Sequence, residues 1–134
     1  MSRNDLVPTS IAYHSKSRVL EVAFGPEDVF EMSAEYLRVH SPSAEVRGHG
    51  PGQETLQVGK ENVAIERIEP VGHYAVRLVF DDGHDSGLYS WQELHRLGTE
   101  HEALWQDYLA RLEAAGHRRR PSLSVVDVSA TPRD

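Results

Sequence analysis

The residues of this chain that are best suited to chemistry surround one histidine. His84 has Asp81 and Asp82 before it and Asp85 after it. Imidazole nitrogens and carboxylate oxygens suit zinc or iron, so a metal ligand is one interpretation of His84. Asp82 and Gly83, however, are typical of a solvated hairpin turn, and a histidine beside such a turn commonly makes a hydrogen bond to a neighbouring loop. We favour this structural interpretation and keep the metal ligand as the alternative.

Several other kinds of site are excluded by residues that the sequence lacks. The 134 residues include no cysteine, which rules out disulfides, zinc–thiolate sites and iron–sulfur clusters held by the chain's own thiolates. None of the eight histidines is followed two residues later by an acid, the pair that iron oxygenases use in their facial triad. The glycine-rich stretch 48–53 and the Gly59-Lys60 pair match neither a dinucleotide-binding motif nor a P-loop. We therefore predict that the chain is not an enzyme.

Alternating apolar residues predict the strands that must position His84. Ser33, after the third strand, can cap a single helical turn. Asp82 and Gly83 follow the last strand and are expected to reverse the sheet. On that last strand, one face should belong to the core, and it includes Tyr74. The expected strands are 11–14, 18–24, 29–32, 63–68 and 73–80.

Two helices are predicted after the sheet. Each begins at a capping box, the first at 90–93 and the second at 99–102. Gly98 is expected to end the first helix and Gly116 the second. The apolar stripe of the second helix includes Trp105 and Tyr108, which at helical spacing are expected to be core residues.

The expected fold class is therefore α+β. It consists of a small, mostly antiparallel sheet built from hairpins, one short helix after the third strand, and two C-terminal helices packed on the sheet. We expect one domain over 1–117 and a basic, flexible tail over 118–134. The proline- and glycine-rich stretch 41–60 is expected to be a long loop that is functional or mobile.

Charge and hydropathy limit the partners. The net charge of −7 disfavours binding to nucleic acid or to anionic membranes. The N-terminus lacks the apolar core of a signal peptide, and no segment is long and apolar enough to span a membrane. We therefore expect a cytoplasmic protein that acts through another protein.

Two segments carry a family resemblance. Residues 69–91, around His84, and residues 36–45 together resemble the gamma-butyrobetaine hydroxylase-like N-terminal domain. In the hydroxylases this domain resembles an appendage before the catalytic barrel that carries the iron and 2-oxoglutarate chemistry. The resemblance therefore implies an accessory role, because this chain ends before any barrel.

The same resemblance bears on metal binding. The hydroxylase domain holds a structural zinc through three cysteines and one histidine. The cysteine positions correspond here to Ser41, Ser43 and Val46, and His84 matches the remaining ligand. The resemblance also brings the loop with His40, Glu45 and His49 near His84. It implies that the known zinc site is lost, so zinc or iron would have to bind in another way.

We favour a small non-catalytic accessory domain that binds an unidentified protein. The alternative is a metal-binding or iron-handling accessory protein, because the domain also resembles an attachment on Mrp-type P-loop ATPases that carry iron–sulfur clusters. In that case the partner would be such an ATPase or another metal-cofactor assembly protein. A small-molecule or allosteric sensor stays open as a third class. The expected interaction surface comprises Arg38, His40, Ser41, His49, Asp82 and His84.

Overall fold

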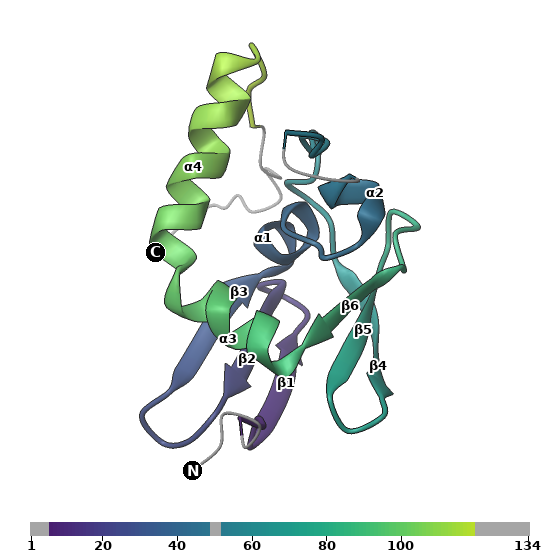
Figure 1. Cartoon of the computed structure of the whole chain (residues 1–134), viewed down its shortest axis with the longest axis vertical. Coiled ribbons are helices and arrows are strands. Elements are labelled where there is room, and N and C mark those ends of the chain that lie inside the picture. Colours follow the sequence, from purple (N-terminus) through teal and green to yellow (C-terminus); the bar gives the residue numbers. More distant parts are fainter. Residues whose placement is uncertain (1–5, 49–51, 120–134) are drawn as a thin grey trace.

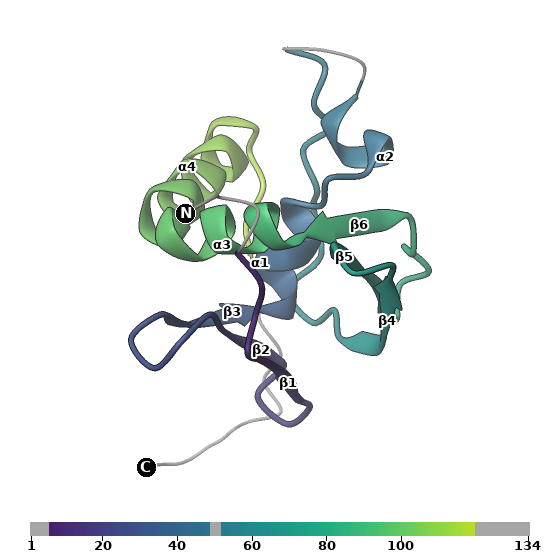
Figure 2. The same ribbon diagram turned by 60° about the horizontal axis from the view of Figure 1, so that its bottom comes forward.

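Two antiparallel sheets and four helices make up the part of the chain that the structure describes (Figures 1 and 2). The computed structural model describes residues 6–48 and 52–119. The predicted α+β class is confirmed, with the strands divided between two three-stranded sheets. The first sheet contains β1 (Ser10–His14), β2 (Val19–Ala23) and β3 (Val29–Ser33), and the second contains β4 (Ile65–Val71), β5 (Ala75–Phe80) and β6 (Gly87–Ser90).

The hairpins follow the predicted alternation, except at the β4–β5 turn and at the β5–β6 connection. The opening hairpin is confirmed, with Tyr13 opposite Leu20. In the second sheet β5 is central, and residues 81–86 connect it to β6 in place of a two-residue turn. The prediction that Tyr74 belongs to the core was wrong. It lies in the β4–β5 turn, one residue before β5 begins, and its side chain is exposed.

Two short helices lie between the sheets in sequence. α1 (Ala34–Val39) is capped by Ser33, whose hydroxyl accepts the amide hydrogen of Tyr36 at 3.0 Å, as predicted. α2 (Ala44–Arg47) falls in the stretch that we expected to be an irregular loop. Ser43 caps it in the same manner, by accepting the amide hydrogen of Glu45 at 3.1 Å. The sequence did not predict α2, because a helix of one turn is too short to show a periodic pattern of apolar residues.

α3 (Trp91–Thr99) and α4 (His101–Ala114) are the two predicted C-terminal helices. The Ser90 cap is confirmed by its hydrogen bond with the Glu93 amide at 3.1 Å. Gly98 does not end α3. A Cβ atom at this position would lie 2.4 Å from Cγ of Phe30, so the glycine allows β3 to pack closely against the helix. The prediction of a second capping box was also wrong, because the Thr99 hydroxyl donates to the Arg96 carbonyl instead of capping α4.

Both sheets, α1 and α3 share one apolar core. A second cluster joins α1 to α4 through Val39, Tyr108 and Leu112, with Trp105 and Leu56 packed against it. The predicted burial of Tyr108 is confirmed, since 1% of its surface is exposed. None of the described helices is long and apolar enough to cross a membrane.

The basic segment after α4 folds back onto the body of the domain as far as it is described. Arg119 donates two hydrogen bonds to the buried carboxylate of Glu35, at 2.8 and 2.6 Å, and its guanidinium lies 5.2 Å from the centre of the Trp105 ring. The rest of the predicted tail, residues 120–134, lies outside the described residues.

Candidate functional site

His84 lies at the centre of a hydrogen-bond cluster that runs from the buried Ser41 to the exposed Glu45. Its Nδ1 is 3.0 Å from a carboxylate oxygen of Glu45, and its Nε2 is 2.9 Å from the hydroxyl oxygen of Ser41. A carboxylate can only accept, so Nδ1 carries the proton and the Ser41 hydroxyl donates to Nε2. Burial lowers the pKa of His84 below its ordinary value, and the charge of Arg38 adds to this, while Glu45 opposes it. The neutral tautomer therefore satisfies the whole arrangement.

The order of groups in this cluster is that of a serine–histidine–acid triad. A triad also needs an accessible nucleophile, and here Ser41 has no exposed surface. Its oxygen also accepts the amide hydrogen of Ser43 at 3.2 Å, and the backbone of Gly87 lies so close that a Cβ there would be 2.5 Å from it. A substrate carbonyl cannot reach this oxygen. The cluster therefore links α2 and the loop before β6 as a structural unit.

The same residues do not fit the zinc site of the hydroxylase-like domains. Zinc there needs thiolates and a free imidazole nitrogen. Both nitrogens of His84 are occupied, and the hydroxyls of Ser43 and Ser86 are 2.7 Å apart in a hydrogen bond of their own. Within the described ranges, no group of three or more His, Asp or Glu residues is arranged to hold a metal ion.

Arg38 and Asp82 form a second internal link. Nε of Arg38 is 2.9 Å from Asp82, which also accepts hydrogen bonds from Lys60 at 2.6 Å and from the His84 amide at 3.1 Å. Burial would raise the pKa of Asp82, but these hydrogen bonds and the charge of Arg38 outweigh it and lower the pKa to about 2. The carboxylate therefore holds α1, Lys60 and the β5–β6 connection together.

The residues of the expected interaction surface differ in their exposure. Arg38, Ser41 and His84 are buried, with 7%, 0% and 5% of their surfaces exposed. They are engaged within the domain and cannot meet a partner directly. Asp82 lies in the ion pairs just described, and His49 falls outside the described residues. Of the expected set, His40 and Ser41 line an open cavity.

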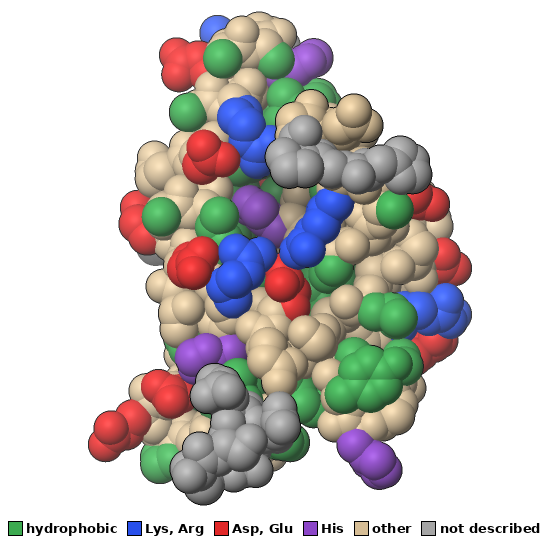
Figure 3. Space-filling model, viewed as in Figure 1, with side chains coloured by type: hydrophobic (Ala, Val, Ile, Leu, Met, Phe, Trp, Pro, Cys, Tyr) green, Lys and Arg blue, Asp and Glu red, His purple; other side chains and the backbone are tan. Residues whose placement is uncertain are grey.

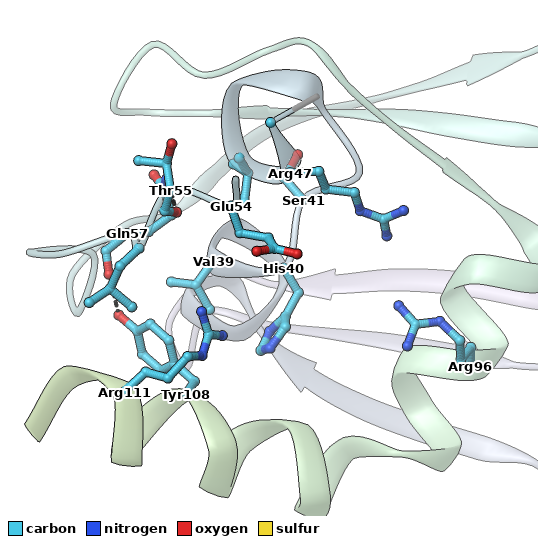
Figure 4. A pocket seen from close by; sticks show the side chains of 13 residues that line it. Val39, His40, Ser41, Arg47, Glu54, Thr55, Gln57, Arg96, Tyr108 and Arg111 are labelled. Atoms are coloured by element: carbon cyan, nitrogen blue, oxygen red, sulfur yellow. Dashed lines mark hydrogen bonds between the residues drawn. The ribbon is translucent and has the colours of Figure 1, made fainter. Parts of the chain in front are cut away.

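That cavity has a volume of about 470 Å³ and opens between α1, α2 and α4. Val39, Val46, Leu56 and Tyr108 supply its apolar lining, and Arg47, Arg96 and Arg111 supply its positive charge. Figure 3 shows basic side chains and a histidine gathered around this hollow, and Figure 4 shows Arg47, Arg96 and Arg111 reaching it from three helices. We call it the arginine pocket.

The arginines of the pocket are only partly engaged by acids of the domain. Arg47 and Arg96 share Glu93, at 2.6 and 2.7 Å, and Arg96 also contacts Glu100 at 3.3 Å. Arg111 contacts Asp107 through Nε at 3.0 Å. Between 42% and 47% of each arginine side chain is exposed. Glu54 is the one acid among the lining residues. Guanidinium groups present several donors in a plane, so the pocket has donors to spare for a carboxylate.

His40 contributes an incompletely satisfied polar atom to the same pocket. Its Nδ1 is 3.0 Å from the carbonyl oxygen of Tyr36, which can only accept, so Nδ1 carries a proton. Among the described residues, Nε2 of His40 is buried and has no hydrogen-bond partner. Burial lowers the pKa of His40; the hydrogen bond to Tyr36 opposes this effect, and the charges of Arg111 and Arg96 reinforce it.

The arginine pocket was missed in the sequence because its residues are far apart in the chain. Arg47, Arg96 and Arg111 each lie in the last turn of a helix, where a cation is also explained by the helix dipole. The signal available was a set of three arginines on polar helix faces in an acidic chain. Nothing in their spacing indicates that the three helices converge.

The two sheets and four helices define a small α+β domain, and the comparison with known families identifies its kind. Residues 11–95 match the model of the family described as gamma-butyrobetaine hydroxylase-like, N-terminal, so the chain belongs to this family. The resemblance of segments 36–45 and 69–91 is thereby confirmed. No curated protein matches the chain.

Solved structures of similar proteins share the fold. One NMR solution structure has 50% sequence identity and a TM-score of 0.74, and covers 92% of this chain and 98% of its own. A second has 47% identity and a TM-score of 0.75, and covers 98% and 96%. A crystal structure from Acidithiobacillus ferrooxidans, a protein of unknown function in the DUF971 family, has 36% identity and a TM-score of 0.60, covering 72% of this chain and 98% of that one.

Proposed function

We propose that this chain is a non-catalytic accessory domain that docks an acidic segment of a partner protein in the arginine pocket. The observation that supports this most strongly is the meeting of Arg47, Arg96 and Arg111 around one open hollow. The chain as a whole carries a net charge of −7, so this concentration of positive charge runs against its composition. Charge complementarity of this kind steers association and selects the partner.

The shape of the pocket favours a segment of protein as the occupant. Its volume of about 470 Å³ is enough for a few side chains, and its lining combines an apolar wall with the arginine rim. Leu56, which is only partly buried and rests on the cluster that contains Tyr108, can pack against the aliphatic part of an acidic side chain while an arginine pairs with its carboxylate. Tyr108 is held in place because its hydroxyl donates to the Gln57 carbonyl at 2.8 Å.

The chemistry around His84 supports a role without catalysis. The serine of the triad-like cluster is buried, and both histidine nitrogens are engaged in hydrogen bonds. This cluster ties Ser41 and Glu45 to His84, and Arg38 ties α1 to Asp82 and to Gln57 of the pocket lining. We infer that they hold the docking site in shape.

Charge reversal at Arg111 tests the proposal. The probe is a fluorescent hexaglutamate peptide blocked at both ends, with hexaglutamine as the neutral control. Loss of a charge-assisted hydrogen bond costs about 1.5–3 kcal/mol, so Arg111→Glu should weaken hexaglutamate binding roughly 10- to 100-fold by fluorescence anisotropy. Binding of the peptide to the wild-type chain is itself required.

Lys16→Glu is the matched control because it makes the same charge change in the exposed turn between β1 and β2, on the first sheet. It should leave the affinity nearly unchanged. Equal weakening by the two variants would show that the peptide responds to total charge, and the pocket would then not be the docking site.

A second candidate function is iron or zinc handling beside a partner such as an Mrp-type ATPase or a metal-cofactor assembly protein. It rests on the family resemblance and on the closeness of His84 to Glu45. Because both nitrogens of His84 are engaged, the partner would have to supply most of the ligands.

Elemental analysis of untagged protein, purified without chelator, tests this second candidate. The metal-handling proposal requires stoichiometric metal in the wild-type chain or in its complex, and loss of that metal in the His84→Ala variant. Folded wild-type protein that stays free of iron and zinc after incubation with either ion would rule out a site in the chain itself.

A further inference from the structure

We propose that His40 is the group in the arginine pocket that senses the bound carboxylate, taking up a proton from solution at Nε2 and donating it in a hydrogen bond to the ligand. This inference rests on the proposed function. It adds that docking is coupled to pH and that His40 determines the preference for an anion.

The geometry around His40 carries the argument. The Tyr36 carbonyl fixes a proton on Nδ1, which leaves Nε2 as a bare acceptor in the neutral ring. This atom is shielded from solvent and has no partner among the described residues. A buried polar atom without a partner is costly, and such atoms often mark sites where a ligand completes the hydrogen bonding.

The neighbours of His40 favour an anion as that ligand. Arg96 and Arg111 disfavour a positive charge on His40 while the pocket is empty. A carboxylate placed between the guanidinium groups reverses the local balance, because it favours the protonated ring. The ionisable or charged side chains around the ring are Tyr36 from α1, Arg96 from α3, Asp107, Tyr108 and Arg111 from α4, and Glu54 from the pocket rim.

Because Nε2 is shielded, a carboxylate reaches it only if side chains that line the pocket move aside, and Arg96 and Arg111 are among those side chains. The side chains of Arg96 and Arg111 are 42% and 43% exposed, so they have room to move as a carboxylate enters. The His40 ring is fixed from the other side, since its centre lies 4.7 Å from that of Tyr36. The proton comes from solution, and no covalent bond forms or breaks.

Proton uptake is the measurable consequence. The glutamates of the peptide have ordinary pKa values near 4.3, so between about pH 6.5 and 7.5 they stay ionised, and His40 is the group expected to gain the proton. Each proton taken up raises the affinity by up to about tenfold per unit fall in pH. Calorimetric titration with hexaglutamate in two buffers of different ionisation enthalpy reports the number of protons bound.

The expected result is net proton uptake by the wild-type chain and its loss in His40→Gln. His101→Gln is the matched control, because His101 also stacks on Tyr36, at 4.3 Å between ring centres, and does not line the pocket. It should take up protons as the wild-type chain does.

NMR titration of the His40 ring in the wild-type chain, with and without peptide, gives the same test without a substitution. A pKa of His40 that rises on binding supports the inference. Binding without proton uptake, or with an unchanged pKa of His40, would overturn it while leaving the docking proposal intact. Failure of the peptide to bind would overturn both.

Discussion

The sequence neighbours of His84 and His40 do not reveal which groups their rings contact in the folded domain. His84 has three acids close by in the chain, yet its ring pairs with Ser41 and with Glu45, which is remote in sequence. His40 has no such pattern around it, yet its Nε2 is the atom left without a partner. Burial lowers the pKa of both rings, so both favour the neutral form in the free domain.

These two histidines predict how stability changes with pH. A histidine whose pKa is lower in the folded state than in the unfolded chain binds its proton more readily after unfolding. The contribution of these two histidines to the free energy of unfolding should therefore be constant above about pH 6.5 and should fall as the pH drops below that value. The slope should reach at most about 1.4 kcal/mol per pH unit for each histidine.

Urea unfolding at a series of pH values between about 7.5 and 5 measures this slope. Asp82 should not contribute, because its pKa of about 2 in the folded domain, against an ordinary value near 4, places its effect at lower pH. His84→Gln should flatten the dependence. Stability that rises as the pH falls would contradict the assigned neutral states.

At the scale of the elements, one glycine decides how the first sheet meets the helices. Gly98 lies inside α3, where alanine would be favoured by about 1 kcal/mol on helix propensity alone. Its missing side chain makes room for the Phe30 ring of β3, which also packs edge-on against Phe24 and His95.

Gly98→Ala should therefore destabilise the domain in spite of the better helix propensity. Overpacking costs about 1–3 kcal/mol and the propensity gain offsets about 1 kcal/mol of it, so a net loss of up to about 2 kcal/mol is expected by chemical denaturation. In a Phe30→Ala background the clash is absent, and the same substitution should become neutral or stabilising. Equal effects in the two backgrounds would mean that the contact with Phe30 is unimportant.

Some of these elements can be predicted from the sequence and others cannot. Alternation predicts the hairpins because each strand buries one face, and Ser33 and Ser90 reveal two helix starts because their caps are local. The local pattern predicts a helix end at Gly98, because a local rule does not include the contact of this glycine with β3. The helix α2 is too short to show a period.

The two candidate sites also differ in how far the sequence predicts them, because local patterns do not show which distant segments meet. The cluster around His84 was expected in part, since the family resemblance brings its segments together. The arginine pocket depends on α2, α3 and α4 approaching one another, and each of its arginines is locally an ordinary helix-terminal cation. Only the tertiary arrangement shows that they share a cavity.

The whole molecule combines an acidic composition with the arginine pocket on its surface. With a net charge of −7, it should repel an acidic peptide at most of its surface. The hollow lies on the face between α2 and α4 (Figure 3), and α4 is held there by the cluster of Val39, Tyr108 and Leu112 and by the Arg119–Glu35 pair. Specific binding of an acidic segment must therefore be localised.

NMR mapping of the amide groups on addition of hexaglutamate tests the docking claim most directly. We expect the largest shift changes in α2, in residues 54–57 and around Arg111 in α4, with little change in β1 and β2 and little response to hexaglutamine. Changes centred on the second sheet, or none at peptide concentrations that saturate an ordinary weak site, would contradict the assignment of the arginine pocket as the docking site.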